Sequence, residues 1–407
     1  MALPEMIKIK QIFNNNKINN IDNEIKNQLH KIPHNINKGS NIAIAVGSRG
    51  IANIKTIVKN VVDFVKGEKA NPFVIPAMGS HGGATAEGQK KILKSYGITE
   101  DFLKAPIRSS MEVVELPNNG VTNKIYIDKI ASEADGIIII NRIKSHTSFH
   151  GTYESGLMKM LVIGLGKHKQ AIEIHKHGIN GLKNLILPTA KQIIKYSKIL
   201  FGIAIVENAY DEIMLIKAIT PADFENIEPG LLKIAKENMP KLPVEDIDIL
   251  LIDQMGKNIS GVGIDPNIIG RIRIQGEKEP DTPKIKRIIV SDLTDESNGN
   301  AIGIGLADFI TKKLYKKIDY RPTYENAITT SFIERVKIPI ISDNEKSALD
   351  QAIRTLGNID INALRVVRIK NTLKLDEFYV SRSIYDEIKD SKNIKKIADK
   401  IDIFKTN

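Results

Sequence analysis

Cysteine and tryptophan are absent from this sequence of 407 residues, and aromatic residues make up only 5% of it. Without cysteine, the chain can form neither a disulfide nor a catalytic thiolate, and it cannot build a zinc or iron–sulfur site from thiolates. A metal bound by the chain itself must therefore use His, Asp, Glu or Lys side chains. A sulfur ligand could reach such a metal only on a cofactor.

Long apolar runs are also missing from the sequence. No stretch reaches the roughly 18 residues of a membrane span. The first residues, MALPEMIKIKQIF, lack the apolar core and the cleavage site of a signal peptide. We therefore expect a cytoplasmic protein with no membrane partner.

The formal net charge of +11 could indicate a nucleic-acid partner. Lysines are mixed with acidic residues throughout the chain, however, and few aromatic residues are available to stack on bases. These features favour a lysine-rich solvated surface over a nucleic-acid site. An anionic substrate fits the positive charge equally well.

The order of the apolar runs predicts an α/β fold. Ile42–Val46 and Pro72–Ala77 have the length of strands, and each is followed by a glycine-containing loop and then by a helical pattern. Strand, loop and helix in this order indicate a parallel sheet, whose ligands bind at the carboxyl ends of the strands. The continuous run Gly136–Ile140 is typical of a central strand. A second such unit opens at Ile247–Ile252.

The length of the chain favours more than one domain. We predict an amino-terminal α/β domain over residues 1–240 and a carboxyl-terminal α/β domain over residues 241–380. A final helix within residues 381–407 is expected to pack back on the first domain, and residues 1–40 are expected to form a peripheral arm. An active-site cleft is expected between the two domains.

The segment Asn141–Gly178, called the reactive segment below, has the composition of a reaction centre. It holds five of the eight histidines, which are His146, His150, His168, His175 and His177. Histidine is a common metal ligand and an acid or base near neutral pH. Lys159 lies in an otherwise apolar run, where burial would lower the pKa of its amine and make it available for covalent chemistry. Alternatively, Lys159 could belong to an amphipathic helix and keep its amine in water.

Two loops at predicted strand ends carry further candidates. Ser48 and Arg49 follow the first strand, and His81 lies in the glycine-rich loop Gly79–Gly83 after the second strand. These glycines could equally well form an ordinary turn that needs positive φ. Arg49 on the equivalent loop favours a functional site, because both loops would open at the same edge of the sheet.

Taken together, these motifs resemble the nickel-pincer lactate racemase family. They follow the family's order with similar gaps and comprise Ser48-Arg49, Gly79–Thr85 with His81, His146, Ser155–Lys159, His175 and the pair Gln254 and Lys257. The resemblance covers about residues 41–257 by motif. It implies a two-domain α/β fold for most of the chain.

The resemblance also implies a cofactor. Lys159 would form a thioamide with the nickel-pincer nucleotide, a pyridinium mononucleotide that carries two sulfurs. His175 would complete the coordination of the nickel. Further contacts to the cofactor would come from Ser48, Gly79, Gly82 and Gly156. Separate biosynthetic enzymes would supply this cofactor, and its sulfurs suit a chain without cysteine.

The activity implied by the resemblance is racemisation or epimerisation of a 2-hydroxy acid. Hydride would leave the substrate Cα reversibly, with a 2-keto acid as the intermediate. His81 and His146 would be the two acid/base groups, one for each enantiomer. Arg49, Gln254 and Lys257 would hold the carboxylate and polarise the carbonyl of the intermediate.

Several positions depart from the family's pattern. Val46 and Asp253 stand where the family has an acidic residue and a tyrosine, and the family's tryptophan near the cofactor has no counterpart here. The substrate is therefore expected to differ from lactate itself. A slightly longer stretch after His146 leaves His150 as a rival for its role.

Two other classes of function stay open. A metal-dependent hydrolase or lyase could use His81, His146 and His175 as zinc ligands, although the HExxH spacing is missing. A non-catalytic anion-binding protein could use Arg49 and the glycine-rich loop, but it would leave Lys159 unexplained. The metal content and the mass of the purified protein distinguish these classes.

Overall fold

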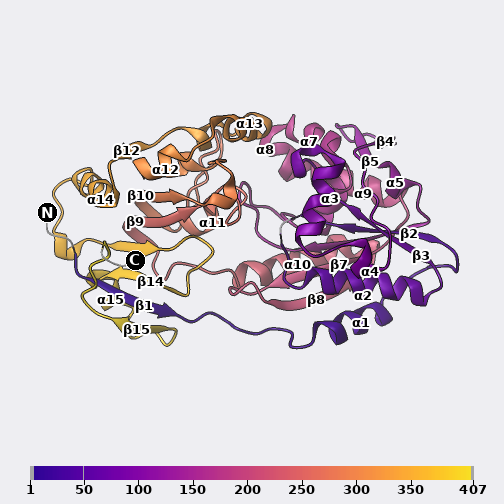
Figure 1. The fold of residues 1–407 in the computed structure, drawn as a ribbon, viewed down its shortest axis with the longest axis horizontal. Helices are drawn as coiled ribbons and strands as arrows, with labels where there is room; N and C mark the ends of the chain where they lie inside the picture. Colours follow the sequence, from indigo (N-terminus) through magenta and orange to yellow (C-terminus); the bar gives the residue numbers. More distant parts are fainter. Residues whose placement is uncertain (1–3, 49, 405–407) are drawn as a thin grey trace. The chain divides into compact units, whose positions relative to one another are not determined.

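The structure is a computed structural model that describes residues 4–48 and 50–404. It divides into two compact units (Figure 1). The amino-terminal unit is Asn14–Met239, and the carboxyl-terminal unit combines the residues up to Phe13 with those from Pro240 on. Each unit contains a sheet with covering helices, which confirms the α/β fold class. The cleft expected between the units stays a prediction.

The amino-terminal unit contains a five-stranded sheet. In spatial order its strands are β3 (Asn71–Pro76), β2 (Asn41–Val46), β6 (Gly136–Arg142), β7 (Ile199–Glu207) and β8 (Ile213–Ile219). The first four strands are parallel, and β8 runs antiparallel to β7. The central position of β6 confirms the prediction from its unbroken apolar run, because a strand covered on both faces needs apolar side chains on both.

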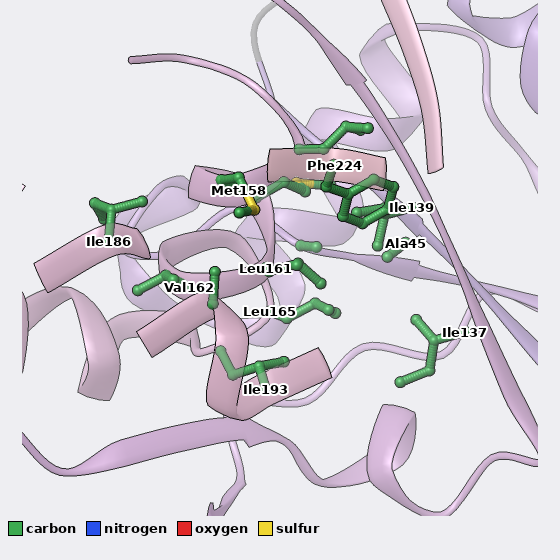
Figure 2. Packing of buried hydrophobic residues seen from close by; sticks show 14 of the residues in the cluster. Ala45, Ile137, Ile139, Met158, Leu161, Val162, Leu165, Ile186, Ile193 and Phe224 are labelled. Carbon is green, nitrogen blue, oxygen red and sulfur yellow. The ribbon is translucent and has the colours of Figure 1, made fainter. Parts of the chain in front are cut away.

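Alternate residues of these strands face two apolar layers. On one face, Ile138 and Ile140 of β6 pack in the same cluster as α1 (Ile21–Lys31) and α2 (Ile54–Gly67). On the other face, Ile137 and Ile139 pack with α9 (Ile186–Tyr196) and α10 (Phe224–Glu237). Figure 2 shows Met158, Leu161 and Leu165 of the reactive segment in this second layer. Each fully buried side chain of this size contributes roughly 1.5–3 kcal/mol to folding.

Smaller elements complete the amino-terminal unit. The helices α3 (Ala86–Ser95) and α4 (Glu100–Leu103) follow β3, and β4 (Val113–Leu116) pairs with β5 (Ile125–Asp128) in a separate antiparallel ribbon. The short helix α5 (Lys129–Ser132) leads into β6. No helix within residues 4–48 and 50–404 is long and apolar enough to cross a membrane.

The carboxyl-terminal unit is built on an eight-stranded mixed sheet. Its order is β12 (Ile340–Ser342), β11 (Phe309–Thr311), β10 (Lys284–Leu293), β9 (Asp246–Met255), β13 (Val366–Ile369), β14 (Glu377–Ser381), β1 (Met6–Gln11) and β15 (Ile394–Ala398). The first five strands are parallel, and the last three join them through antiparallel pairs. The helices of this unit are α11 (Pro266–Ile269), α12 (Lys312–Lys316), α13 (Tyr320–Thr330), α14 (Glu345–Arg354) and α15 (Arg382–Ile388).

The two ends of the chain differ from the prediction. Residues 1–40 do not form one peripheral arm, since β1 lies inside the carboxyl-terminal sheet with Ile7 and Ile9 fully buried. The expected final helix stops after α15, and β15 then pairs with β1 in the same unit. Both errors have one cause, because the pairing joins segments from opposite ends of the chain and neither segment shows its partner in its own sequence.

Candidate functional site

The reactive segment begins where β6 ends, at the carboxyl edge of the parallel strands. A short hairpin-like loop comes first, closed by hydrogen bonds between Lys144 and Ser155 in both directions (2.9 and 3.1 Å). The helical turn α6 (Leu157–Lys159) then widens into a π-type turn over Met160–Gly164. The helix α7 (Lys167–His175) follows. Wide turns of this kind are frequent at functional sites.

Lys159 has the apolar surroundings that its sequence predicts. Its neighbours Leu157, Met158 and Met160 are buried, whereas Lys159 itself is half-buried. The Lys159 Nζ lies 5.7 Å from the centre of the Phe149 ring. The aromatic face offers the ammonium group a modest attraction on the loop side of the segment.

His175, at the end of α7, is electrostatically coupled to Lys159. Burial and, second, the positive charge of Lys159 lower the pKa of His175 to about 4. The imidazole is therefore neutral at physiological pH. Its Nδ1 is buried and has no hydrogen-bond partner within residues 4–48 and 50–404. The charge of Lys159 thus acts on His175, and their assignment to the cofactor and the metal stays a prediction.

His146 lies on the loop before Lys159 and packs against the same phenylalanine. The centres of the His146 and Phe149 rings are 4.5 Å apart. The backbone N–H of Ser148 donates to His146 Nδ1 at 3.1 Å, which leaves the proton of the neutral ring on Nε2. Phe149 is therefore a shared neighbour of His146 and Lys159, two predicted site residues.

A buried carboxylate, Glu154, organises the loop that carries His146. Its oxygens accept hydrogen bonds from Ser145 Oγ (3.0 Å), the backbone N–H of His146 (2.6 Å) and of Gly151 (3.2 Å), and Lys236 Nζ (2.5 Å). Burial alone would raise the pKa of Glu154, but the hydrogen bonds from His150, Lys236 and the His146 backbone outweigh it and lower this pKa to about 2. Glu154 is therefore ionised throughout the physiological range.

His150, the sequence-based rival of His146, lies on the outer side of this carboxylate. Its Nδ1 is 3.4 Å from Glu154 Oε1, and its side chain is 47% exposed. Of the two other histidines without an assigned role, His177 is exposed, and His168 has a buried Nδ1 without a hydrogen-bond partner in the described ranges.

His81 follows β3 on the glycine-rich loop, and a short hydrogen bond joins its Nδ1 to Ser48 Oγ after β2. Gln89 stabilises this loop, because its side-chain amide donates to the carbonyl oxygens of Gly79 (2.9 Å) and His81 (3.3 Å). Ser48 and His81 are thus in contact, as expected for loops at one edge of the sheet. Arg49 lies outside the described residues.

The glycines of the predicted site have identifiable packing reasons. Gly79 has a φ of +58°, and a Cβ there would lie 3.2 Å from the carbonyl oxygen of Ile163 in the reactive segment. A Cβ on Gly82, at φ +67°, would lie 2.6 Å from the backbone nitrogen of Gln89. Both glycines let the His81 loop approach its neighbours closely. Their assignment to cofactor contacts stays a prediction.

A buried lysine that the sequence reading missed supports the same loop. Lys167 is fully buried, lies 2.9 Å from Asp128 Oδ2 and donates to the carbonyl oxygen of Pro76 and to Gln89 Oε1. Burial lowers the pKa of Lys167, and the charge of Asp128 opposes this shift. In the sequence, the consecutive polar residues Lys167, His168 and Lys169 are typical of the solvent-exposed start of a helix. No local signal therefore marks Lys167 as buried.

Gln254 and Lys257 lie in the carboxyl-terminal unit, at and just after the end of β9. Lys257 Nζ donates to the carbonyl oxygen of Gly261 (3.1 Å) and to Asn326 Oδ1 (3.2 Å). Asp253, which replaces the family's tyrosine, is paired with Arg368 at 2.7 Å. Burial raises the pKa of Asp253, and Arg368 opposes the rise.

The chain's own side chains do not gather around a common metal position. Within residues 4–48 and 50–404, no group of three or more His, Cys, Asp or Glu residues could hold a metal ion. His81, His146 and His175 therefore do not form the three-ligand zinc site that a hydrolase or lyase would need. A metal at His175 would need donors from elsewhere.

Comparisons with known proteins agree with this fold. Residues 43–223 match a family described as a domain of unknown function, DUF362. The search of curated proteins finds no match. The solved structure of a lactate racemase apoprotein from Thermoanaerobacterium thermosaccharolyticum is similar with a TM-score of 0.56 at 13% identity, over 90% of this chain and 98% of that one. A structural-genomics structure of a protein from Thermotoga maritima has a TM-score of 0.51 at 14% identity, over 78% of this chain and 83% of that one. These similarities show that the chain shares its α/β fold with both structures.

Proposed function

We propose that this protein is a racemase or epimerase of a 2-hydroxy acid that carries a nickel-pincer nucleotide on Lys159. The observation that carries the proposal is a half-buried, neutral His175 that feels the charge of Lys159 and whose buried Nδ1 lacks a hydrogen-bond partner in the described part of the chain. The shared fold with a lactate racemase apoprotein supports it. The departures at Val46 and Asp253 support a substrate other than lactate.

The residues present fit this cofactor. A neutral imidazole nitrogen is a suitable nickel ligand, and soft sulfur donors with square-planar geometry suit the same ion. Because the described residues provide no three-ligand cluster, the remaining donors would have to arrive with the cofactor. Lys159 would hold the group covalently through its amine. When bound, the cofactor supplies a hydride acceptor for the substrate Cα.

The two histidines of the proposed acid/base pair are set up differently. His81 Nδ1 contacts the hydroxyl of Ser48, which can accept a hydrogen bond from Nδ1–H, and in that tautomer Nε2 is able to act as a base. His146 accepts from Ser148 at Nδ1 and presents Nε2–H as a donor. In this state His81 is suited to take the hydroxyl proton of a 2-hydroxy acid, and His146 to donate a hydrogen bond to substrate oxygen. His146 can take a proton at Nε2 only after its tautomer changes.

The substrate carboxylate is proposed to bind Arg49, Gln254 and Lys257. Arginine and lysine favour an anion, and a positively charged wall stabilises the alkoxide-like charge that develops during hydride transfer. The hydrolase or lyase reading has no supporting cluster among the described residues. The anion-binding reading leaves the environment of Lys159 without a purpose.

The test is intact mass and nickel analysis of the chain produced together with the cofactor-forming enzymes. We expect a nucleotide-sized mass increment on Lys159 with bound nickel, and its loss in Lys159→Arg. Lys169→Arg is the matched control, because Lys169 is an exposed lysine on α7 whose amine lies over Tyr126 at 4.3 Å. An unmodified mass with zinc or without metal would instead support the hydrolase or the anion-binding protein.

A further inference from the structure

The helix α10 makes three polar contacts with the stretch of the reactive segment between His146 and Lys159. They come from the carbonyl oxygen of Glu225, the carboxylate of Glu228 and the amine of Lys236. At about 3.6 residues per turn, these three positions share one face of the helix. Only Leu157 and Met158 among the residues in these contacts belong to a sequence motif, and none of the three positions on α10 was singled out.

Glu228 makes the most deeply buried of these contacts. It is 1% exposed, and its Oε2 accepts from the backbone N–H of Met158 at 3.0 Å, with a further backbone hydrogen bond from Leu157. The carboxylate thus binds the first N–H groups of α6, where a negative charge is favoured. Lys159 is the next residue of the same turn.

Gly156 is shaped to admit this carboxylate. A Cβ at position 156 would lie 2.1 Å from Glu228 Oε1, so any other residue would push the carboxylate away from the turn. Glu228 Oε1 itself is buried without a hydrogen-bond partner in the described ranges. Burial raises the pKa of Glu228 to about 7, although the backbone N–H groups of Met158 and Leu157 oppose the rise. A buried acid with one unpaired oxygen is costly to keep, which argues for a role beyond filling the core.

Pro229 follows Glu228 and accounts for a second contact. Proline has no N–H, so inside a helix it leaves the carbonyl oxygen four residues earlier without its usual donor. That carbonyl belongs to Glu225, and it accepts from the Tyr153 hydroxyl at 2.9 Å. The Glu225 carbonyl oxygen, which lacks a donor within α10, thereby accepts a hydrogen bond from the loop before Lys159.

Lys236 makes the third contact, through Glu154. Its Nζ donates to Glu154 Oε1 at 2.5 Å, and the other oxygen of Glu154 accepts from the His146 backbone at 2.6 Å. The helix α10 therefore contacts the loop of His146 through Lys236, near its carboxyl end, and the turn of Lys159 through Glu228, in its first half.

We propose that α10 positions the reactive segment, and that Glu228 is a positioning residue that orients the Lys159 turn through the N–H groups of Leu157 and Met158. The assignment of Lys159 as the cofactor-bearing lysine rests on the proposed function. The contacts of α10 do not, and they predict an effect on the Lys159 amine in the protein without cofactor.

The experiment compares the labelling rate of Lys159 with that of Lys169 by an amine-reactive anhydride in trace amount, read by peptide mass spectrometry. Glu228→Leu fills the same space without accepting hydrogen bonds. If Glu228 only fills the core, Leu leaves the Lys159 to Lys169 ratio unchanged. If Glu228 orients the turn, the freed turn exposes Lys159 and the ratio rises severalfold. Glu228→Gln, which keeps one acceptor oxygen, should give a smaller rise and serves as the second variant if Leu prevents folding.

The control variant is Asn60→Ala, which removes the part-buried hydrogen bonds from Asn60 on α2 to Asp22 on α1 and to Thr56 on α2 without touching the reactive segment. We expect its Lys159 to Lys169 labelling ratio to equal that of the chain without a substitution. A ratio that does not rise in either folded Glu228 variant overturns the proposal. Because the labelling uses protein without cofactor, it is separate from the mass and nickel test, whose failure would overturn the function and leave the role of α10 standing.

Discussion

The pKa of His175 is set by its burial and by the charge of Lys159. Burial is the larger cause of its lowered pKa, and the ammonium of Lys159 is the second. The folded state therefore disfavours the imidazolium. As the pH falls from the ordinary pKa of 6.5 towards about 4, the unfolded chain takes up a proton at His175 that the folded chain does not, and the free energy of unfolding decreases. Above this window the ring is neutral and able to bind a metal.

We predict that Lys159→Met raises the pKa of His175 while leaving it below 6.5, because burial persists after the charge is removed. The pKa can be followed by NMR titration of the histidine ring signals in protein without cofactor. An unchanged titration of His175 would mean that the two side chains are not neighbours in solution.

At the same scale, the sequence shows some of the site and conceals the rest. Lys159 is recognisable because a lysine interrupts a run of apolar residues, and the gap to His175 fits the family's pattern. Glu228 gives no such signal, since a glutamate in an amphipathic helix normally faces water. Its burial is decided by Gly156 and Met158, which are distant in sequence, and only the folded structure brings them together.

The loop between β6 and α6 shows how one buried charge can organise an element. Glu154 gathers two backbone N–H groups, a hydroxyl and an ammonium, so its loss leaves several buried donors without an acceptor. The β6 strand before it needs no such support, because unbroken apolar residues such as Ile139 anchor it on both faces of the sheet. Strand position was therefore predictable from the sequence, whereas loop conformation was not.

We predict that Glu154→Ala lowers the free energy of unfolding by about 3 kcal/mol, the typical cost of buried donors left unpaired. Amide exchange at His146 and Gly151 should increase markedly, since both N–H groups lose their acceptor. Urea unfolding and hydrogen-exchange mass spectrometry measure the two effects. Lys236→Met is the matched control, because it removes one partner and leaves the backbone donors paired, and its cost should be about 1 kcal/mol. Equal exchange in the two variants would contradict the role given to Glu154.

For the whole molecule, the chain divides near Pro240 as the composition suggests, but its first strand belongs to the other unit. The boundary near Pro240 is visible in the sequence, but the return of residues 6–11 to the carboxyl-terminal sheet is not. The strand β1 is short and alternates Ile7 and Ile9 with lysines, a pattern that a solvated arm could also show. Its meaning comes from β14 and β15, which flank it on either side.

This arrangement makes the first strand a part of the carboxyl-terminal core. Ile9 is fully buried and packs in the same cluster as Val367, Phe378 and Ile394, so Ile9→Ala should cost about 3 kcal/mol of unfolding free energy. Amide exchange should rise in β14 and β15 and stay unchanged in β6, because β6 belongs to the other compact unit. Lys10→Ala changes an exposed residue of the same strand and should have little effect on either unit. An equal rise in β6 would show that the two units unfold together. A rise in β6 alone would mean that β1 does not belong to the carboxyl-terminal sheet.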